Sequence, residues 1–260
     1  MYLPQLLKKS AKGEKLVALT CYDASFARLL VRCGIDILLV GDSLGMTVQG
    51  HATTLPVTLE QMVYHTEAVA RGAEGGALVL TDLPFGSYQQ GPEQAFAAAA
   101  RLLAAGANMV KLEGGSVMAP TVAFITQRGI PVCGHLGLLP QSVNQTGYAA
   151  QGRDGASATQ LLRDAEDLMG AGVKLMVLES IPSVLAEEVT QRLAVPTIGI
   201  GAGPYCNGQV LVLQDMLGLT PKPPRFAKDF MAGALSLEEA VLSYARAVRK
   251  GEFPGPEHCV

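Results

Sequence analysis

Short uninterrupted runs of apolar residues alternate along the chain with longer segments whose apolar residues recur every three or four positions. A continuous apolar run of about five residues is typical of a strand that is buried on both faces, as in a parallel sheet. The longer segments have the spacing of an amphipathic helix. We predict strands at residues 16–22, 37–42, 78–83, 109–113, 132–136, 174–179, 197–201 and 209–214.

Helices are predicted between most of these strands, at residues 24–33, 59–70, 92–105, 156–171, 183–193 and 237–250. Pro92 stands at a favoured first-turn position, and Ser236 is a suitable N-cap. Strands alternating with helices favour an α/β protein, a (βα)8 barrel of the TIM type, formed by a single domain over residues 1–260. An open doubly wound sheet is the alternative. It usually brings a GxGxxG turn, and the glycines at 199, 201 and 203 do not have that spacing.

Three of the predicted strands end in an acidic residue. Asp42, Asp82 and Glu113 each close an apolar run, and the C-terminal ends of parallel strands are where α/β folds build their active sites. Ionised carboxylates are seldom buried without a partner, and three on successive strands would converge on one barrel mouth. Converging carboxylate oxygens suit a hard divalent cation such as Mg²⁺. We therefore favour a metal site over the alternative of solvated loop acids.

Composition favours a cytoplasmic enzyme with small-molecule substrates. The chain has 20 Lys and Arg residues against 23 Asp and Glu, and the net charge of -3 offers no basic surface for nucleic acid. No uncharged apolar stretch reaches the roughly 18 residues that a membrane helix needs, and the first residues lack the features of a secretory signal. Five cysteines without CxxC spacing are expected to be reduced. Only 17% of the residues are charged, which favours a homo-oligomer that covers apolar surface.

Two segments between predicted elements, residues 44–58 and 137–155, are too long for plain connectors. Loops longer than about 12 residues in compact domains tend to be lids or binding elements, and both of these follow strands on the presumed catalytic side. Surface packing or a subunit contact would explain them equally well. The glycine-rich turn at 199–203 has two explanations as well, an anion site of backbone N–H groups or a tight turn.

Six stretches of sequence, taken in order, resemble one family closely. They read VGDSLGM at 40–46, TLPVT at 54–58, DLPFGSY at 82–88, VKLEGG at 110–115, VCGHLGL with PQSVNQ at 132–138 and 140–145, and PTIGIGAG at 196–203. The chain is similar over about residues 22–230 to the ketopantoate hydroxymethyltransferases, also called 3-methyl-2-oxobutanoate hydroxymethyltransferases. One departure is visible at residues 146–150, where the family usually reads a Gly-Gly-Tyr-Lys type of turn and this chain is shorter and lacks the lysine.

The resemblance implies a barrel of the phosphoenolpyruvate/pyruvate-binding kind and a particular reaction. A hydroxymethyl group passes from 5,10-methylenetetrahydrofolate to 3-methyl-2-oxobutanoate, giving ketopantoate for pantothenate and coenzyme A biosynthesis. One Mg²⁺ per subunit is implied, chelated by the oxo acid and stabilising the enolate that forms when the C3 proton leaves. The family also implies a decamer built from pentameric rings.

The resemblance also assigns roles to residues of this chain. The metal is held, directly or through water, by Asp42, Asp82 and Glu113. The oxo acid is bound with the help of Asp42, Ser43, Asp82 and Lys111. Glu179, at the end of the sixth predicted strand, is the base, and His135, at the end of the fifth, is a further candidate. Strand alternation agrees with one assignment, because Lys111 and Glu113 are two residues apart and share a face. The alternatives are a surface lysine, a structural ion pair for Glu179 and a plain hydrogen-bonding role for His135.

Other functions stay open at this point. Another Mg²⁺-dependent 2-oxo-acid aldolase or C–C lyase, such as one of the isocitrate lyase type, would share the acid cluster, but those lyases usually carry a cysteine-bearing catalytic loop that has no evident counterpart here. A Schiff-base aldolase would use Lys111 as its nucleophile, and it predicts borohydride trapping without a metal requirement. A non-catalytic binding barrel is the third alternative, and any turnover would exclude it.

Overall fold

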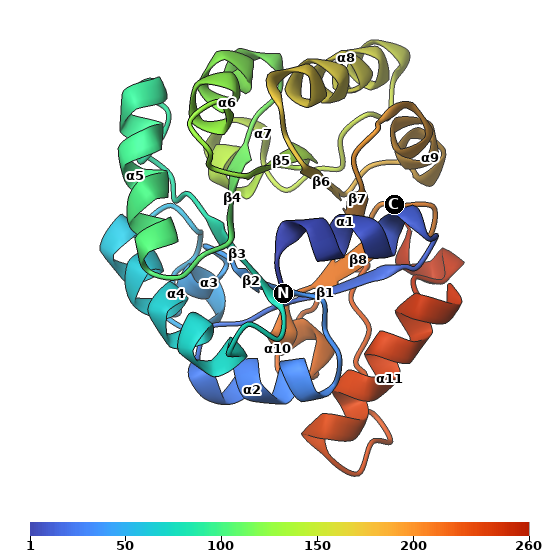
Figure 1. Cartoon of the computed structure of the whole chain (residues 1–260). Helices are drawn as coiled ribbons and strands as arrows, with labels where there is room; N and C mark the ends of the chain where they lie inside the picture. Colours follow the sequence, from blue (N-terminus) through green and yellow to red (C-terminus); the bar gives the residue numbers. More distant parts are fainter. Residues whose placement is uncertain (260) are drawn as a thin grey trace.

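Eight parallel strands close into a barrel in a computed structural model that describes residues 1–259 (Figure 1). The strands follow one another around the ring in chain order, and β8 pairs with β1 to close it. Their bounds are β1 Leu16–Thr20, β2 Ile37–Val40, β3 Leu78–Asp82, β4 Met109–Glu113, β5 Val132–Gly137, β6 Leu175–Glu179, β7 Thr197–Ile200 and β8 Gly208–Leu211. The predicted barrel is confirmed, and each strand ends within three residues of its predicted bounds.

Helices surround the barrel (Figure 1). Their bounds are α1 Leu3–Ala11, α2 Ala24–Arg32, α3 Leu44–Thr47, α4 Leu59–Ala73, α5 Pro92–Ala104, α6 Ala119–Thr126, α7 Val143–Thr146, α8 Gly155–Ala171, α9 Ser183–Arg192, α10 Leu213–Met216 and α11 Leu237–Lys250, with 3-10 turns η1 Ser116–Met118, η2 Pro140–Ser142 and η3 Pro256–His258. All six predicted helices are present. Residues 213–214 were predicted as the end of the last strand, but they lie in α10, and over residues 201–207 the described chain has a turn in place of a helix.

Alternate strand residues face the inside of the barrel or the surrounding helices. Met109 belongs to the apolar cluster inside the barrel, whereas Val110 and Leu112 pack in the layer between strands and helices. Further members of the inner cluster are Leu16, Leu39, Leu80, Leu175, Ile198 and Val210. The barrel interior is therefore a packed core. Lys111 and Glu113 lie on the same face of β4 as Met109. Their side chains therefore also point to the inside of the barrel, nearer its C-terminal mouth.

Helix α1 lies across the N-terminal end of the barrel (Figure 1). Leu6 of α1 is fully buried against the inner cluster. Lys9 Nζ lies 2.6 Å from Asp36 Oδ1, and Asp36 Oδ2 accepts a 2.9 Å hydrogen bond from the Val17 backbone N–H. Helix α1 thus covers the N-terminal end of the barrel.

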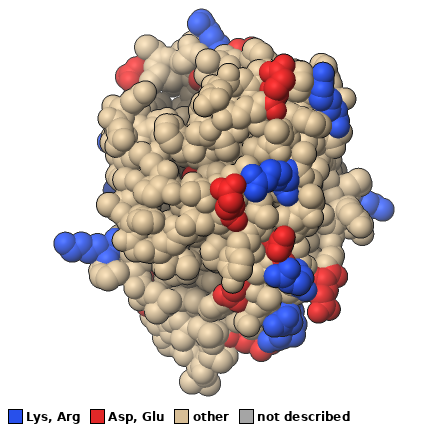
Figure 2. All heavy atoms as spheres, turned by 90° about the vertical axis from the view of Figure 1, so that its left-hand side faces the viewer, with Lys and Arg blue, Asp and Glu red and all other residues tan. Residues whose placement is uncertain are grey.

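The surface and the cysteines agree with the composition. Figure 2 shows a face on which acidic and basic side chains are interspersed along one side, beside a broad area that carries neither. Across residues 1–259 the five cysteines are free, four of them buried, as predicted. None of the helices in this part of the chain has both the length and the apolar character needed to cross a membrane.

Candidate active site at the barrel mouth

A cavity of about 940 Å³ opens at the C-terminal ends of the strands. All of the predicted site residues line it, namely Asp42, Ser43, Asp82, Lys111, Glu113, His135 and Glu179. Strand register explains their proximity, because Asp82 pairs with Lys111 across β3 and β4, and Glu113 pairs with His135 across β4 and β5. Both long loops reach the same cavity through Met46 and Tyr148. Their placement on the catalytic side is confirmed, and a lid function stays a prediction.

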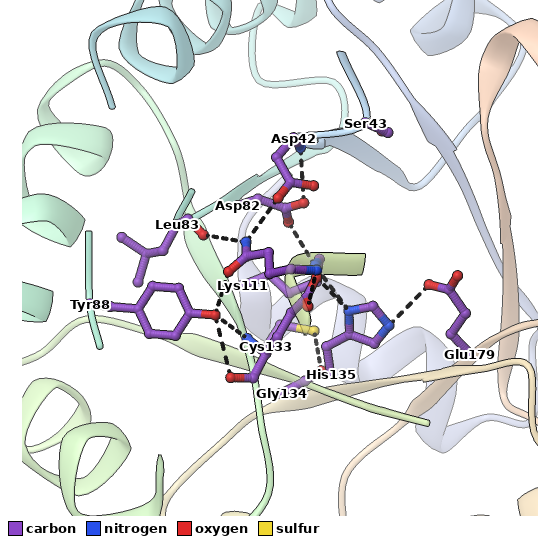
Figure 3. A network of polar contacts seen from close by, with 12 residues as sticks. Asp42, Ser43, Asp82, Leu83, Tyr88, Lys111, Cys133, Gly134, His135 and Glu179 are labelled. Atoms are coloured by element: carbon purple, nitrogen blue, oxygen red, sulfur yellow. Dashed lines mark hydrogen bonds and ion pairs between the residues drawn. The ribbon is translucent and has the colours of Figure 1, made fainter. Parts of the chain in front are cut away.

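Lys111 extends from β4 into a group of buried acids (Figure 3). Its Nζ lies 3.0 Å from Asp82 Oδ1 and 3.2 Å from His135 Nδ1. Burial lowers the pKa of Lys111, but the charges of Asp82, Glu113 and Asp42 outweigh burial and raise it above its ordinary value. These charges favour the protonated form of Lys111, and because the residue is buried, its interpretation as a surface lysine is wrong.

Asp42 and Asp82 are neighbouring buried carboxylates, and the Asp42 backbone N–H donates to Asp82 Oδ2 at 3.1 Å. Burial and the charges of Asp82 and Glu113 raise the pKa of Asp42 well above its usual range. Burial also raises the pKa of Asp82, although Lys111 acts against it. The mouth therefore contains more carboxylate than Lys111 can neutralise, and a further cation would relieve the repulsion.

The acids suit Mg²⁺ by donor type but do not form a complete cage. Within residues 1–259 there is no group of three or more His, Cys, Asp or Glu side chains that could hold a metal ion by itself. Mg²⁺ usually takes one or two protein carboxylates and fills its other positions with water and substrate oxygens. Asp82 Oδ1 is buried without a hydrogen bond in the described structure, despite its 3.0 Å approach to Lys111. An oxygen in this state, beside the crowded carboxylate of Asp42, fits a metal ligand.

Gln141, from the long loop after β5, holds the acids in place and was not predicted from the sequence. Its Nε2 donates to Asp42 Oδ2 at 2.8 Å and to the Leu83 carbonyl at 2.9 Å. Its Oε1 accepts a 2.6 Å hydrogen bond from the Tyr88 hydroxyl, and its backbone N–H donates to Glu113 Oε2 at 3.0 Å. The only sequence signal was its place in a long loop on the catalytic side, which does not single out one glutamine.

Glu179 lies on the far side of His135 from the Asp42 and Asp82 pair (Figure 3). Its Oε2 is 3.1 Å from His135 Nε2, although the angle is too poor for a hydrogen bond. The Glu179 side chain is 15% exposed and that of His135 3%, so the carboxylate can reach a ligand more easily than the imidazole can. His135 therefore stands between a buried cation and an accessible carboxylate.

Ser43 completes the predicted set at the N-terminal end of α3. Its Oγ lies 2.9 Å from the Tyr22 hydroxyl, and the residue lines the cavity. A Cβ at Gly41 would come within 2.8 Å of that Oγ. A side chain at position 41 would therefore force the Ser43 hydroxyl away from its present position.

Comparison with known proteins matches residues 1–256 to the family described as ketopantoate hydroxymethyltransferase. The chain belongs to this family. A protein of Thiobacillus denitrificans named 3-methyl-2-oxobutanoate hydroxymethyltransferase is 61% identical over 248 residues, which cover 95% of this chain and 94% of the relative. A protein of Methylobacillus flagellatus with the same name is 57% identical over 260 residues and 99% of each chain. The predicted family is confirmed.

Solved structures show the same barrel at low sequence identity. Phosphonopyruvate hydrolase in complex with oxalate and Mg²⁺ has a TM-score of 0.64 and 13% identity, covering 98% of this chain and 99% of its own. A 2,3-dimethylmalate lyase, a member of the PEP mutase/isocitrate lyase superfamily, has a TM-score of 0.60 and 17% identity, covering 83% and 79%. At these identities the likeness concerns the fold alone, and it agrees with the predicted kind of barrel.

In this member of the ketopantoate hydroxymethyltransferase family, packing accounts for the glycine-rich turn after β7. Gly201 and Gly203 have φ of 62° and 79°, values that favour glycine. A Cβ at Gly201 would lie 2.8 Å from the Phe226 ring, and one at Gly203 would lie 2.4 Å from Ser183 Cβ. A tight turn is therefore sufficient to explain the glycines at these positions.

Proposed function

We propose that this chain transfers a hydroxymethyl group from 5,10-methylenetetrahydrofolate to 3-methyl-2-oxobutanoate, giving ketopantoate. Membership of the family and the names of its relatives support the reaction. The observation in this chain that carries the proposal is the arrangement at the mouth, where buried Lys111 and accessible Glu179 contact opposite nitrogens of His135. One side of the mouth thus offers an anion site, and the other offers a separate base.

Lys111 is positioned to pair with the carboxylate of the oxo acid. An ammonium group has three donors, and the hydrogen bond with His135 Nδ1 beside the ion pair with Asp82 leaves donor capacity for the substrate. The Ser43 hydroxyl is a second donor at the same mouth. Apolar side chains of Leu39 and Val177 line the cavity and suit the branched hydrocarbon end of the substrate.

Asp42 and Asp82 would hold Mg²⁺, with Glu113 in reach through water. When bound, the ion supplies Lewis-acid stabilisation of the negative charge that develops on the keto oxygen. Gln141 supports this role because it keeps one oxygen of Asp42 hydrogen-bonded and fixes the orientation of the carboxylate.

Glu179 is proposed to accept the proton from C3 of the oxo acid. Its carboxylate stands apart from the Asp42 and Asp82 pair, and the adjoining His135 limits its movement. The deprotonated C3 carbon then bonds to the one-carbon unit of the folate. Overall, one water supplies the new hydroxyl group and tetrahydrofolate is released.

The alternative of a Schiff-base aldolase is disfavoured by the charge state of Lys111. The surrounding carboxylates raise its pKa above the ordinary value and so favour the protonated amine, which has no lone pair for attack on a ketone. Family membership also favours one-carbon transfer over another Mg²⁺-dependent aldolase or a C–C lyase of the isocitrate lyase type.

The chain is further proposed to act in the cytoplasm, as a homo-oligomer of one-domain subunits spanning residues 1–260. The low share of charged residues, 17%, supports association because contacts between subunits would cover apolar surface. The family expectation of a decamer would give a particle about ten times the 27.2 kDa of one chain. Light scattering after size exclusion measures this mass, and a monomer would contradict the proposal.

Deuterium exchange at C3 of 3-methyl-2-oxobutanoate tests the proposed function. The protein is incubated with the oxo acid in D₂O with and without Mg²⁺ and tetrahydrofolate, and the C3 proton is followed by NMR. We expect Mg²⁺-dependent exchange, and ketopantoate formation once 5,10-methylenetetrahydrofolate is added. Neither exchange nor ketopantoate would contradict the proposal, and borohydride trapping of the oxo acid on Lys111 would favour the aldolase.

A further inference from the structure

The cavity is much larger than the oxo acid, and its outer part contains polar side chains that the proposed chemistry does not use. A volume of about 940 Å³ lies near the upper end of the range for pockets that enclose drug-sized ligands. A five-carbon acid held at Lys111 fills a small part of it. Part of the remaining wall comes from α10 and the segment that follows it, and this part includes Gln214, Asp215, Leu219 and Phe226.

Asp215 is a buried carboxylate without a cationic partner in the described structure. Its Oδ1 accepts a 2.5 Å hydrogen bond from the Thr220 hydroxyl, and the hydrogen bonds found for this carboxylate involve Oδ1 alone. Burial raises its pKa, with the Thr220 hydrogen bond acting against the shift. Its second oxygen is therefore available to a donor in the cavity.

Gln214, next to Asp215 in the chain, has a side-chain oxygen without a hydrogen bond in the described structure. Its Oε1 is buried and has no hydrogen-bond partner within residues 1–259, yet the residue lines the same cavity. A buried acceptor without a donor is unfavourable, so a ligand that supplies one would be bound more tightly. Gln214 and Asp215 together offer acceptors in a place where the chain itself leaves them incompletely used.

We propose that Asp215, with Gln214, binds the 2-amino-4-oxopyrimidine edge of the pterin ring of the folate donor. This edge presents a ring N–H beside an exocyclic amino group, and such parallel donors match the two oxygens of one carboxylate. Oδ1 keeps a free lone pair after accepting from Thr220. The inference rests on the proposed function, because it assigns the outer cavity to the folate.

Other walls of the outer cavity agree with this placement. The half-buried Phe226 ring and Leu219 supply apolar surface on which a flat heterocycle can lie. Lys222 lines the same cavity and is exposed, so it lies where a carboxylate tail would leave the protein. A buried acceptor with an exposed cation at the rim suits a ligand that has N–H donors at one end and carboxylates at the other.

Asp215→Asn tests the assignment, because it keeps the size of the side chain but turns one acceptor into a donor that faces the pterin donors. We expect the KM for 5,10-methylenetetrahydrofolate and the Kd for tetrahydrofolate to rise on the order of 10- to 100-fold, as for lost hydrogen bonds to a charged group. Removal of the exocyclic amino group from the folate should weaken binding to the wild type strongly and to Asp215→Asn little. Gln214→Leu should weaken tetrahydrofolate binding less.

Mg²⁺-dependent exchange at C3, measured without folate, distinguishes a failure of this assignment from a failure of the proposed function. Exchange within about twofold of wild type in Asp215→Asn shows that the barrel mouth is intact. Asp229→Asn is the matched control, since Asp229 is exposed and caps the Met231 backbone N–H outside the cavity. An unchanged Kd for tetrahydrofolate, or exchange lost in step with folate binding, would overturn the assignment. A wild type that binds tetrahydrofolate through Asp215 yet neither exchanges nor transfers would instead contradict the proposed function alone.

Discussion

At Glu179, the roles of proton acceptor and metal ligand can be separated by one substitution. Glu179→Gln keeps nearly the same volume and removes the acceptor. Because the carboxylate contacts His135 and not the Asp42 and Asp82 pair, binding of Mg²⁺ and of the oxo acid should stay close to wild type. The C3 exchange rate should fall by roughly 10²–10⁴, the range for loss of a positioned base, and hydroxymethyl transfer should fall in parallel. NMR exchange and calorimetric titration measure the two properties.

The matched control is Glu187→Gln, which alters an acid of α9 that is not part of the cavity wall. It should leave exchange and binding unchanged. If Glu179→Gln loses Mg²⁺ binding, Glu179 is a ligand, and His135 becomes the next candidate for the base. If transfer falls while exchange persists, Glu179 acts on the folate side of the reaction.

Gln141 allows the orientation of the metal-binding acids to be tested without changing their charge. Gln141→Ala removes the side-chain hydrogen bonds to Asp42, Leu83 and Tyr88. Loss of such supporting contacts typically weakens metal affinity by about 10- to 100-fold. We expect a Mg²⁺ titration by calorimetry to show this loss, with a smaller one for Tyr88→Phe.

Gln151→Ala serves as the comparison, because this glutamine lies in the same loop but its side chain donates to the exposed Ala149 carbonyl and not to the acids. Its Mg²⁺ affinity should equal that of the wild type. Equal affinities for the Gln141 and Gln151 variants would show that Asp42 does not depend on Gln141 for its orientation.

Among the elements, α1 is held to the barrel by buried Leu6 and by a part-buried ion pair between Lys9 and Asp36, at the opposite end of the barrel from the cavity. Asp36→Ala leaves the Val17 N–H without its acceptor and Lys9 without its partner. We expect the free energy of unfolding to fall by about 2–3 kcal/mol in urea titrations, as for buried donors that lose an acceptor. Lys9→Met should lower it by less than about 1 kcal/mol, because its side chain is partly exposed. In both variants kcat of the folded protein should match wild type, and a fall in kcat without a fall in stability would contradict this account.

The strands could be predicted because a strand buried on both faces must be apolar throughout, and such runs are visible in the sequence. Helices were predicted where one side of the helix remains in solvent. The missed helix α6 buries Thr121, Val122 and Ile125, and its apolar residues are spread around it, so no clear period remains. Helix α6 forms through packing against the barrel, and its local sequence carries little signal of it. The missed α1 is different, because Pro4 stands in its first turn and Lys8 and Lys9 in its last turn, positions that favour a helix.

The candidate site could be predicted as far as it lies on strand ends. Asp42, Asp82 and Glu113 close apolar runs, and the parallel barrel brings such ends together in any sequence with this pattern. Gln141 could not be found in this way, since it contacts Asp42 from 99 residues away and comes from a loop without periodicity. Asp215 follows the last predicted strand, residues 209–214, so it carries the same strand-end pattern, but no role was assigned to it from the sequence, and it lies in the short helix α10.

At the scale of the whole molecule, the crowded carboxylates at the mouth lower the stability of the metal-free protein. Mg²⁺ that binds only the folded chain should stabilise it by about 2.7 kcal/mol at a hundred times its Kd. For a chain of this size each kcal/mol is worth roughly 2–4 °C, so Tm should rise by about 5–10 °C. Scanning calorimetry in MgCl₂, against NaCl of equal ionic strength, measures the rise.

Asp42→Asn is the informative variant for this stability, because the amide oxygen can still accept from Gln141 while one charge leaves the cluster. Burial and the charges of Asp82 and Glu113 raise the pKa of Asp42, so removing its charge relieves repulsion in the metal-free state. Without Mg²⁺ its Tm should therefore equal or exceed that of the wild type, and with Mg²⁺ most of the rise should disappear. If Tm of the wild type rises as much in NaCl as in MgCl₂, or if Tm of Asp42→Asn rises as much in MgCl₂ as that of the wild type, the ion acts on the surface charges and not at the barrel mouth.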